Sequence, residues 1–220
     1  MKKGIFIVID GTDGSGKKTQ TELLVKRLEK EQHSVLPISF PNYGKPAAKL
    51  VEMYLAGEFG TDERAVDPYV ASTFYAADRF AEKQTIQKAL DEEKIVVADR
   101  YVTANMAHQG GKFQTSEERK KYFNWLYDFE YLHGQIPKPN LNIILYVPAE
   151  INIKLIDTRG NAKDIHENNP EHLKRADQTY REISEEFPNI ELIECCENGE
   201  ILAREKIHEL IWEKVKGMLK

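Results

Sequence analysis

Apolar residues gather in five short runs along the chain. Each run is apolar almost throughout and does not alternate with polar residues, which is typical of strands that are covered on both faces of a parallel sheet. The runs span residues 4–10, 33–40, 94–100, 140–148 and 189–196. We therefore predict five β-strands.

Charged stretches with helical spacing separate and follow these runs. They cover residues 19–32, 66–93, 116–131, 173–186 and 199–220. Because strand and helix alternate along the chain, the pattern predicts an α/β fold with a doubly wound, five-stranded parallel sheet. No repeat, low-complexity segment or linker divides the 220 residues, so we expect a single domain over residues 1–220.

Composition and charge exclude several classes of protein. Hydrophobic residues make up 41% and charged residues 30% of the chain, which is ordinary for a globular enzyme and too apolar for a disordered protein. The formal net charge of -5 argues against a general nucleic-acid binder, because phosphate neutralisation needs a basic face. The apolar run that begins the chain is far shorter than the ~20 residues that cross a bilayer, so we expect no membrane partner and no export signal.

Cysteine and histidine residues give no sign of a structural cross-link or metal. The two cysteines, Cys195 and Cys196, are neighbours in sequence and cannot join distant segments, so a reducing, cytoplasmic location is expected. The six histidines are scattered without the spacing of zinc ligands, and a structural zinc ion is not expected.

A glycine-rich segment between the first apolar run and the first predicted helix matches a phosphate-binding loop. Residues 11–17 read GTDGSGK, which fits the pattern G-x-x-x-x-G-K. Glycines let backbone N–H groups turn toward phosphate oxygens, the helix start adds partial positive charge, and Lys17 reaches the β- and γ-phosphates. An ordinary glycine-rich turn is the alternative, but the flanking strand and helix favour a P-loop NTPase type of sheet. The predicted nucleotide contacts are Gly11, Asp13, Gly14, Ser15, Gly16, Lys17, Lys18 and Thr19.

The residue after Lys17 departs from the general pattern. A Ser or Thr hydroxyl usually meets Mg²⁺ at this position, and here it is Lys18, which cannot bind a cation. Because Mg²⁺ keeps several water ligands, Thr19, Asp13 and Asp99 are the candidates for its remaining contacts.

Six stretches spaced along most of the chain together make the sequence resemble the thymidylate kinase family. They are residues 11–20, 40–44 (FPNYG), 73–79 (TFYAADR), 98–112, 136–147 and 157–167. The aspartate inside the loop and the DRY that follows an apolar strand are the most specific features. The resemblance implies ATP as phosphoryl donor, dTMP as acceptor, Mg²⁺ as cofactor, a homodimer, and a mobile lid at about residues 157–170.

Three residues suit the recognition of a pyrimidine base. Tyr75 and Arg79 are four residues apart, so on a helix they share a face, where the ring can stack on a base and the guanidinium can donate to a carbonyl oxygen. Asn105 can accept the hydrogen of ring atom N3. The alternatives are a core aromatic for Tyr75 and a helix-surface charge for Arg79. The resemblance also implies that Phe40, Pro41 and Tyr43 contact dTMP.

Arg100 directly follows the third apolar run, which places a permanent cation at the carboxyl end of a parallel strand, where open α/β sheets bind ligands. Its guanidinium can grip phosphate oxygens, and the resemblance implies that it holds the acceptor phosphate. Asp13 resembles the carboxylate that meets the sugar 3′-hydroxyl and the metal region. Asp99 is expected to contact metal or water, with a cap on the next turn as the alternative.

His108 and Gln109 are further candidates for the acceptor site. The family commonly has an aromatic residue at the position of His108 and a serine at that of Ala104, so the pocket is expected to select deoxyribose differently or to titrate near neutral pH. On a helix Asn105 and Gln109 share a face, which also brings Gln109 to the site.

Basic residues of the lid are expected to close over ATP, because phosphoryl transfer relies on positive charge around the transferred group. Arg159 is the candidate for ATP binding and catalysis. Lys163 and Lys18 are the other candidates, either to share this role with Arg159 or to fill it instead. A solvated surface loop is the competing interpretation of the segment. The predicted catalytic set is Lys17, Arg100, Arg159 and Asp13.

Two other functions compete with a monophosphate kinase. A deoxynucleoside kinase needs a carboxylate base after the second strand, and residues 40–44 offer none. A non-catalytic nucleotide-binding switch would keep the loop but need no acceptor pocket. The sequence does not separate dTMP from dUMP, because one methyl group is worth only ~1–3 kcal/mol of discrimination.

Overall fold

The computed structural model describes residues 3–62, 64–159 and 169–219. Its centre is a parallel sheet of five strands in the order β2-β3-β1-β4-β5. The strands are β1 (Ile5–Gly11), β2 (Val35–Ser39), β3 (Ile95–Asp99), β4 (Leu141–Tyr146) and β5 (Ile190–Glu194). The predicted fold class and all five predicted strands are therefore confirmed. A short antiparallel hairpin, β6 (Cys196–Glu197) with β7 (Glu200–Ile201), was not predicted.

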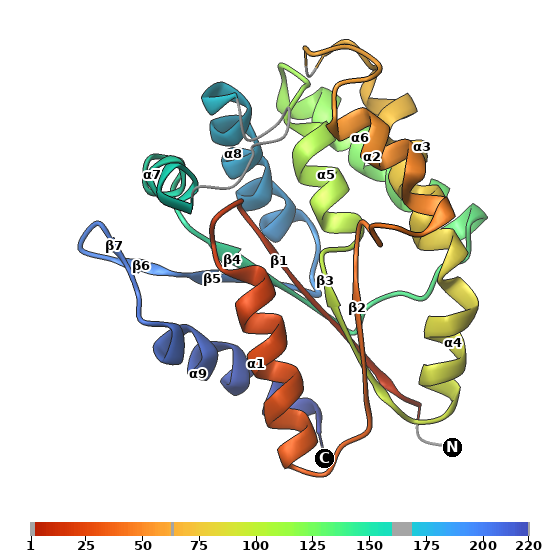
Figure 1. Ribbon diagram of the computed structural model, residues 1–220, viewed down its shortest axis with the longest axis vertical. Coiled ribbons are helices and arrows are strands. Elements are labelled where there is room, and N and C mark those ends of the chain that lie inside the picture. The colour runs from red at the N-terminus through yellow and green to blue at the C-terminus, as the bar shows by residue number, and fades with distance from the viewer. Residues whose placement is uncertain (1–2, 63, 160–168, 220) are drawn as a thin grey trace.

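Helices cover both faces of the sheet (Figure 1). Alternate residues of β1 point to opposite faces, as the pleat requires. Ile7 and Ile9 join a core with α1 (Lys17–Lys30) and α9 (Arg204–Val215), whereas Phe6 and Val8 join the core on the other face. That second core includes side chains of α4 (Lys83–Asp91), α5 (Val102–Gly110), α6 (Ser116–Tyr127) and α8 (Pro170–Glu186).

The long helix predicted over residues 66–93 is two helices, and the prediction of one was wrong. α3 (Pro68–Ala81) is capped by Glu82, and α4 begins at Lys83. α3 packs on α5, whereas α4 packs on strand β3, so the chain has to change direction between them. The side-chain amide of Asn42, which belongs to neither helix, donates to Glu82 at 2.9 Å and so stabilises the junction between α3 and α4.

Other helix boundaries also moved for local reasons. The stretch predicted to end at residue 131 leaves the α-helix at Tyr127 and continues as a π-helix over Asp128–His133. α8 begins at Pro170 rather than at residue 173, because the Asn169 side chain accepts the N–H groups of Glu171 and His172. The stretch predicted from residue 199 starts as strand β7, and its helix begins only at Arg204.

Helices α2 (Lys49–Leu55), α5 and α7 (Ala149–Arg159) were not among the predicted elements. All nine residues of α5 are buried, so this helix has no polar face and shows no amphipathic period. A Cβ on Gly110 in α5 would lie 2.8 Å from the Phe123 ring, which shows how closely α5 approaches α6. In the part of the chain that the structure describes, no helix is long and apolar enough to span a membrane.

Register brings three strand ends to one edge of the sheet. Ile9 of β1 pairs with Asp99 of β3, and Gly11 pairs with Leu145 of β4. Arg100 follows Asp99 with φ of 66°, and its backbone N–H donates to the carbonyl oxygen of Ile9 at 2.9 Å. This left-handed conformation is unfavourable for a residue with a Cβ. The backbone of Arg100 is therefore locally strained where the arginine turns toward the glycine-rich loop.

Candidate active site

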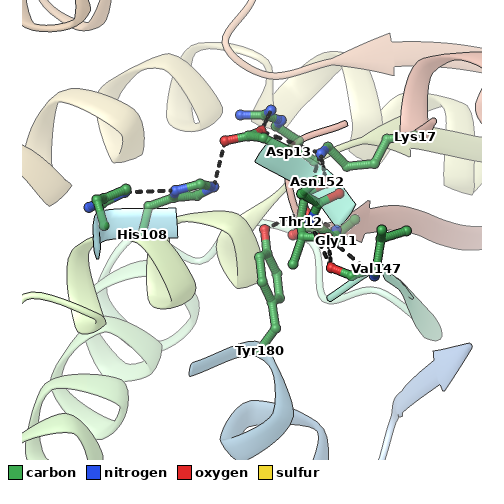
Figure 2. A network of polar contacts seen from close by, with 11 residues as sticks. Gly11, Thr12, Asp13, Lys17, His108, Val147, Asn152 and Tyr180 are labelled. Atoms are coloured by element: carbon green, nitrogen blue, oxygen red, sulfur yellow. Dashed lines mark hydrogen bonds and ion pairs between the residues drawn. The ribbon is translucent and has the colours of Figure 1, made fainter. Parts of the chain in front are cut away.

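The glycine-rich loop connects β1 to α1 and lies against β4. Gly11 has φ of 141°, and a Cβ there would meet the carbonyl oxygen of Leu145 at 2.1 Å, so only glycine fits. The Thr12 hydroxyl donates to the Val147 carbonyl oxygen at 3.1 Å, and the Asn152 amide donates to the same oxygen at 2.7 Å. These contacts hold the loop against the segment that follows β4 (Figure 2).

Lys17 is folded over its own loop. Its ammonium group donates to the carbonyl oxygens of Gly11 at 3.0 Å and of Thr12 at 2.9 Å, and lies 3.5 Å from Asp13 Oδ1. Burial lowers the pKa of Lys17, the nearby Arg100 lowers it further, and the carboxylate of Asp13 opposes the shift. Lys17 is therefore a buried cation whose partners, besides Asp13, are two carbonyl groups.

Arg100 and the loop meet at the same carboxylate. A guanidinium nitrogen of Arg100 lies 2.5 Å from Asp13 Oδ1, the oxygen that also faces Lys17. Asp13 is 5% exposed, whereas one third of the Arg100 side chain is exposed. The structure therefore brings together Lys17, Asp13 and Arg100, three of the four residues predicted to be catalytic. The fourth, Arg159, ends α7, and its side chain lies outside the described part of the chain, as does Lys163 in full.

A second buried carboxylate supports the loop from below. Asp10 accepts hydrogen bonds from the Gly11 N–H at 2.8 Å, the Thr103 hydroxyl at 2.5 Å and the Tyr180 hydroxyl at 2.9 Å. Burial raises the pKa of Asp10, while the Thr103 hydrogen bond and the charge of Lys17 oppose that rise. Asp10 thus ties β1 to α5 and α8. The sequence signal was the acidic residue that ends an apolar run, as Asp99 ends another.

A cavity opens beside Asp13 and Arg100. Its lining includes most residues predicted to contact the acceptor. These are Asp13, Phe40, Pro41, Tyr75, Arg79, Arg100, Asn105 and His108. Tyr43 is 62% exposed and is not part of the lining, and the fully buried Gln109 is not part of it either. Asp78, Leu55, Tyr101 and Ala104 complete the lining.

Arg79 lies in the cavity wall as half of a buried ion pair. Its Nε lies 3.0 Å from both carboxylate oxygens of Glu130, and a terminal nitrogen also donates to Glu130. Its other terminal nitrogen donates to the Tyr101 carbonyl oxygen at 3.3 Å. Burial acts to lower the pKa of Arg79, but the charge of Glu130 raises it overall. With 2% of Arg79 exposed, the alternative of a helix-surface charge is wrong.

Glu130 was missed by the sequence analysis. It lies 51 positions from Arg79, in the π-helical segment Asp128–His133, within a stretch that reads as an ordinary charged helix. A π-turn adds a residue to the helical repeat and is frequent at functional sites. No local pattern marks a buried carboxylate whose partner is on another helix.

Asn105 offers an unused acceptor to the cavity. Its amide nitrogen lies 3.5 Å from the Ser72 carbonyl oxygen, and its Oδ1 is buried without a hydrogen-bond partner among the described residues. Tyr75 is half-buried on α3 and packs edge-on against Tyr54 at 6.2 Å between ring centroids. A donor on a bound base would satisfy the Asn105 oxygen, because buried polar atoms rarely stay unpaired.

His108 forms a histidine pair that the sequence did not indicate. Its Nδ1 lies 3.2 Å from Nε2 of His172 in α8, and the two rings stack with 16° between their planes. On its other side, Nε2 lies 3.9 Å from Asp13 Oδ2 (Figure 2). Burial lowers the pKa of His108 to about 3, although Asp13 acts to raise it. The expectation that this histidine titrates near neutral pH is therefore wrong.

The residues near the loop include a suitable oxygen ligand for a hard cation. Asp99 Oδ1 is buried without a hydrogen-bond partner among the described residues, while Asp13 is paired with Arg100. Thr19 lies half-buried in the first turn of α1, and Lys18 is exposed. In the described part of the chain no three His, Cys, Asp or Glu side chains form a metal-binding group. Asp99 therefore fits a cation that takes its other ligands from water and phosphate, as Mg²⁺ does.

Comparison with known proteins identifies relatives over most of the chain. The thymidylate kinase family model matches residues 9–207. The thymidylate kinase of Mycobacterium tuberculosis is 31% identical over 186 residues, covering 82% of this chain and 86% of its own. A probable thymidylate kinase of Thermococcus gammatolerans is 30% identical over 220 residues, covering 98% and 100%. The structure of thymidylate kinase from Candida albicans superposes with a TM-score of 0.76 at 23% identity, covering 98% and 92%.

The Arg79–Glu130 pair gives a prediction about stability. Glu130→Ala should lower the free energy of unfolding by about 3–5 kcal/mol, because it leaves a guanidinium buried without a counter-charge. Glu117→Ala is the control, since Glu117 and its partner Lys121 are 80% and 71% exposed and their pair should contribute almost nothing. Equilibrium denaturation in urea measures both changes. Equal, small losses would contradict the importance of the buried pair.

Proposed function

The chain belongs to the thymidylate kinase family, and we propose that it transfers the γ-phosphoryl group of ATP to dTMP. An oxygen of the dTMP phosphate forms a bond to the γ-phosphorus as the bond to the β–γ bridging oxygen breaks, giving dTDP and ADP, a step in dTTP synthesis. The observation that carries this proposal is the position of Asp13. Its carboxylate joins Lys17 of the phosphate loop to Arg100 of the neighbouring cavity, so two anion sites lie end to end.

The donor side consists of the loop and the start of α1. Backbone N–H groups of residues 11–17 and the positive end of α1 suit the phosphates of ATP. The Lys17 ammonium group now donates to two loop carbonyl oxygens, which are weaker partners than a phosphate. Binding of ATP would therefore draw Lys17 toward the β- and γ-phosphates with little cost in lost contacts.

On the acceptor side, one residue suits the phosphate of dTMP and three other residues suit its base. Arg100 is the cation that faces the cavity beside the loop, and we assign it to the dTMP phosphate. Arg79, held by Glu130, and Asn105, with an unused Oδ1, are on α3 and α5 and suit thymine O4 and N3–H. Tyr75 lines the same cavity and suits stacking on the base.

Positive charge around the transferred group is the chemistry this site has to supply, because phosphoryl transfer depends on positioning and electrostatic stabilisation. Lys17 and Arg100 hold the two phosphates from opposite sides. When bound, Mg²⁺ neutralises charge on the β- and γ-phosphates, with Asp99, Asp13 and Thr19 as its candidate contacts. We propose Arg159 as the lid residue that completes this charge, with Lys163 and Lys18 as alternatives.

Two competing functions fit the site less well. A nucleotide-dependent switch needs no second pocket, whereas here a cavity with an arginine and an unsatisfied amide adjoins the loop. A deoxynucleoside kinase needs a free carboxylate base near the acceptor. Asp78 lines the cavity, but its Oδ2 accepts the Asn42 N–H at 2.8 Å, and its Oδ1 is buried away from solvent. Substrate choice separates these functions directly.

A substrate panel tests the proposed function. With ATP and Mg²⁺, we expect ADP release that depends on dTMP, a weaker response to dUMP, and none to UMP or thymidine. A coupled assay of ADP formation measures each rate, and enzyme without acceptor is the blank. ADP release at the same rate without dTMP would contradict the proposal, and turnover of thymidine alone would assign the chain to the nucleoside kinases.

The two cavity arginines should differ in importance. Arg100→Ala is expected to lower kcat/KM for dTMP by about 100-fold or more, because it removes a charge-assisted grip on phosphate. In the protein that remains folded, Arg79→Ala is expected to cost about tenfold, because its partner on the base is a neutral carbonyl. Loss of the counter-charge for Glu130 should appear separately as lower stability. Steady-state kinetics measure both, with circular dichroism as a check on folding. Small, equal losses would remove Arg100 from the phosphate site.

We also propose that the enzyme is a cytoplasmic homodimer. The side of α3 that faces away from the cavity forms part of an apolar groove with the π-helical segment. The groove is lined by Thr73, Ala76, Ala77, Phe80, Phe129, Glu130, His133, Gly134 and Ile136. Phe80 is 56% exposed there, and such apolar surface is typical of interfaces. Cys195 and Cys196 are both free thiols, as a reducing compartment would keep them.

Sedimentation tests the homodimer. The wild-type protein should have twice the chain mass of 25.4 kDa, and Phe80→Glu should sediment as a monomer, because it places a charge in the groove. Leu210→Glu is the matched control, since Leu210 is 39% exposed on α9, on the other face of the sheet. A monomeric wild type, or dissociation by Leu210→Glu alone, would contradict this interface.

A further inference from the structure

The stacked histidines lie on two helices and end at the carboxylate of the phosphate loop. His172 is in the first turn of α8, and His108 is near the end of α5. The line runs from His172 Nε2 to His108 Nδ1 at 3.2 Å, and from His108 Nε2 to Asp13 Oδ2 at 3.9 Å. His172 is fully buried and is not part of the cavity lining, whereas His108 and Asp13 are. Figure 2 shows the His108 ring and its contact with Asp13.

The surroundings of His108 decide where its proton lies. The ring is buried, and Asp13 is already paired with Arg100 and Lys17 and lies beyond hydrogen-bond distance of Nε2. This geometry favours the neutral ring, in which one nitrogen carries hydrogen and the other a lone pair. A lone pair on Nε2 would face the negative Asp13 carboxylate, which is repulsive, whereas an N–H there is attracted to it. Nδ1 therefore holds the lone pair, and only an N–H on His172 Nε2 can complete the 3.2 Å contact.

We propose that His172 is a positioning residue for the acceptor site: it donates from Nε2 to His108 Nδ1 and thereby fixes His108 as an Nε2–H donor beside Asp13. The partner of each histidine nitrogen commonly selects the tautomer of a functional histidine in this way. The inference rests on the proposed function for the identity of the substrate. The assignment of the proton itself does not depend on that function.

The fixed tautomer gives the cavity a donor and an acceptor side by side. At 3.9 Å, His108 Nε2 and Asp13 Oδ2 are too far apart for a direct hydrogen bond, but one hydroxyl group can accept from the first and donate to the second. Asp13 contacts Arg100, and His108 is three residues after Asn105 on α5, so the pair adjoins both the proposed phosphate contact and the proposed base contact. In a nucleotide the group between phosphate and base is the sugar. The pair therefore suits the 3′-hydroxyl of a deoxynucleoside monophosphate.

Loss of the His172 donor should weaken recognition of this hydroxyl and leave the phosphate and base contacts in place. His172→Leu removes the donor at similar volume. His172→Gln keeps an amide N–H near the position of Nε2 and should rescue the effect. His208→Leu is the control for loss of a partly buried histidine elsewhere, since His208 is on α9.

The first experiment compares dTMP with 2′,3′-dideoxythymidine monophosphate, which lacks the 3′-hydroxyl. Wild type and His208→Leu should prefer dTMP by about tenfold or more in kcat/KM, as expected for two hydrogen bonds of which one is to a carboxylate. In His172→Leu this preference should fall by about fivefold, mainly through a higher KM for dTMP, and in His172→Gln it should stay within about twofold of wild type. Thermal denaturation of each variant shows which ones are folded.

An unchanged preference in folded His172→Leu would overturn the proposal, because a purely structural residue lowers both substrates alike. Failure of the wild type to phosphorylate dTMP at all would instead count against the proposed function. A second measurement needs no variant. Nitrogen-15 chemical shifts of the imidazoles in wild type should place the His108 proton on Nε2, and a proton on Nδ1 would overturn the proposal whatever the kinetics show.

Discussion

One carboxylate, that of Asp13, holds two cations at the carboxyl edge of the sheet. Lys17 comes from the helix after β1, and Arg100 comes from the turn after β3. Both side chains contact Asp13, which brings the two cations together. Two like charges so close repel, and Lys17 already has a lowered pKa partly because of Arg100. The shared counter-charge makes the arrangement tolerable and keeps both cations at the edge of the sheet where the proposed donor and acceptor phosphates would meet.

Helices α5 and α8 stabilise this edge from the outer face. Tyr180 of α8 and Thr103 of α5 both donate to Asp10 under the loop, and His172 of α8 contacts His108 of α5 above it. The two helices therefore contact the loop region at its base and at the cavity. A rigid edge of this kind suits a reaction in which positioning contributes most of the rate. Because α5 packs on α3, α6 and α8, it is buried along its whole length.

Local sequence patterns were enough to predict the strands and the glycine-rich loop. The remaining elements and site residues depend on contacts between distant parts of the chain, which local patterns do not reveal. The five apolar runs needed no knowledge of their neighbours, because central parallel strands are apolar throughout. The glycine-rich loop was equally local. By contrast, α5 lacks a polar face and shows no period, and the break at Glu82 depends on packing against two different partners. Glu130 and His172 lie 51 and 64 positions from the residues they contact, so no spacing rule could pair them.

The pairing of Arg79 with Glu130 has a consequence for how the substrate approaches. In the cavity wall, the charge of the Arg79 guanidinium is balanced by the buried Glu130 carboxylate, and burial lowers the pKa of His108 to about 3. Among the residues the structure describes, attraction for a phosphate group therefore comes from Lys17 and Arg100, reduced by the Asp13 carboxylate that they share. Under the proposed function, this uneven charge would exert a torque on an approaching nucleotide and turn its phosphate toward the sheet edge before any contact forms. Backward entry would then be disfavoured during the encounter itself.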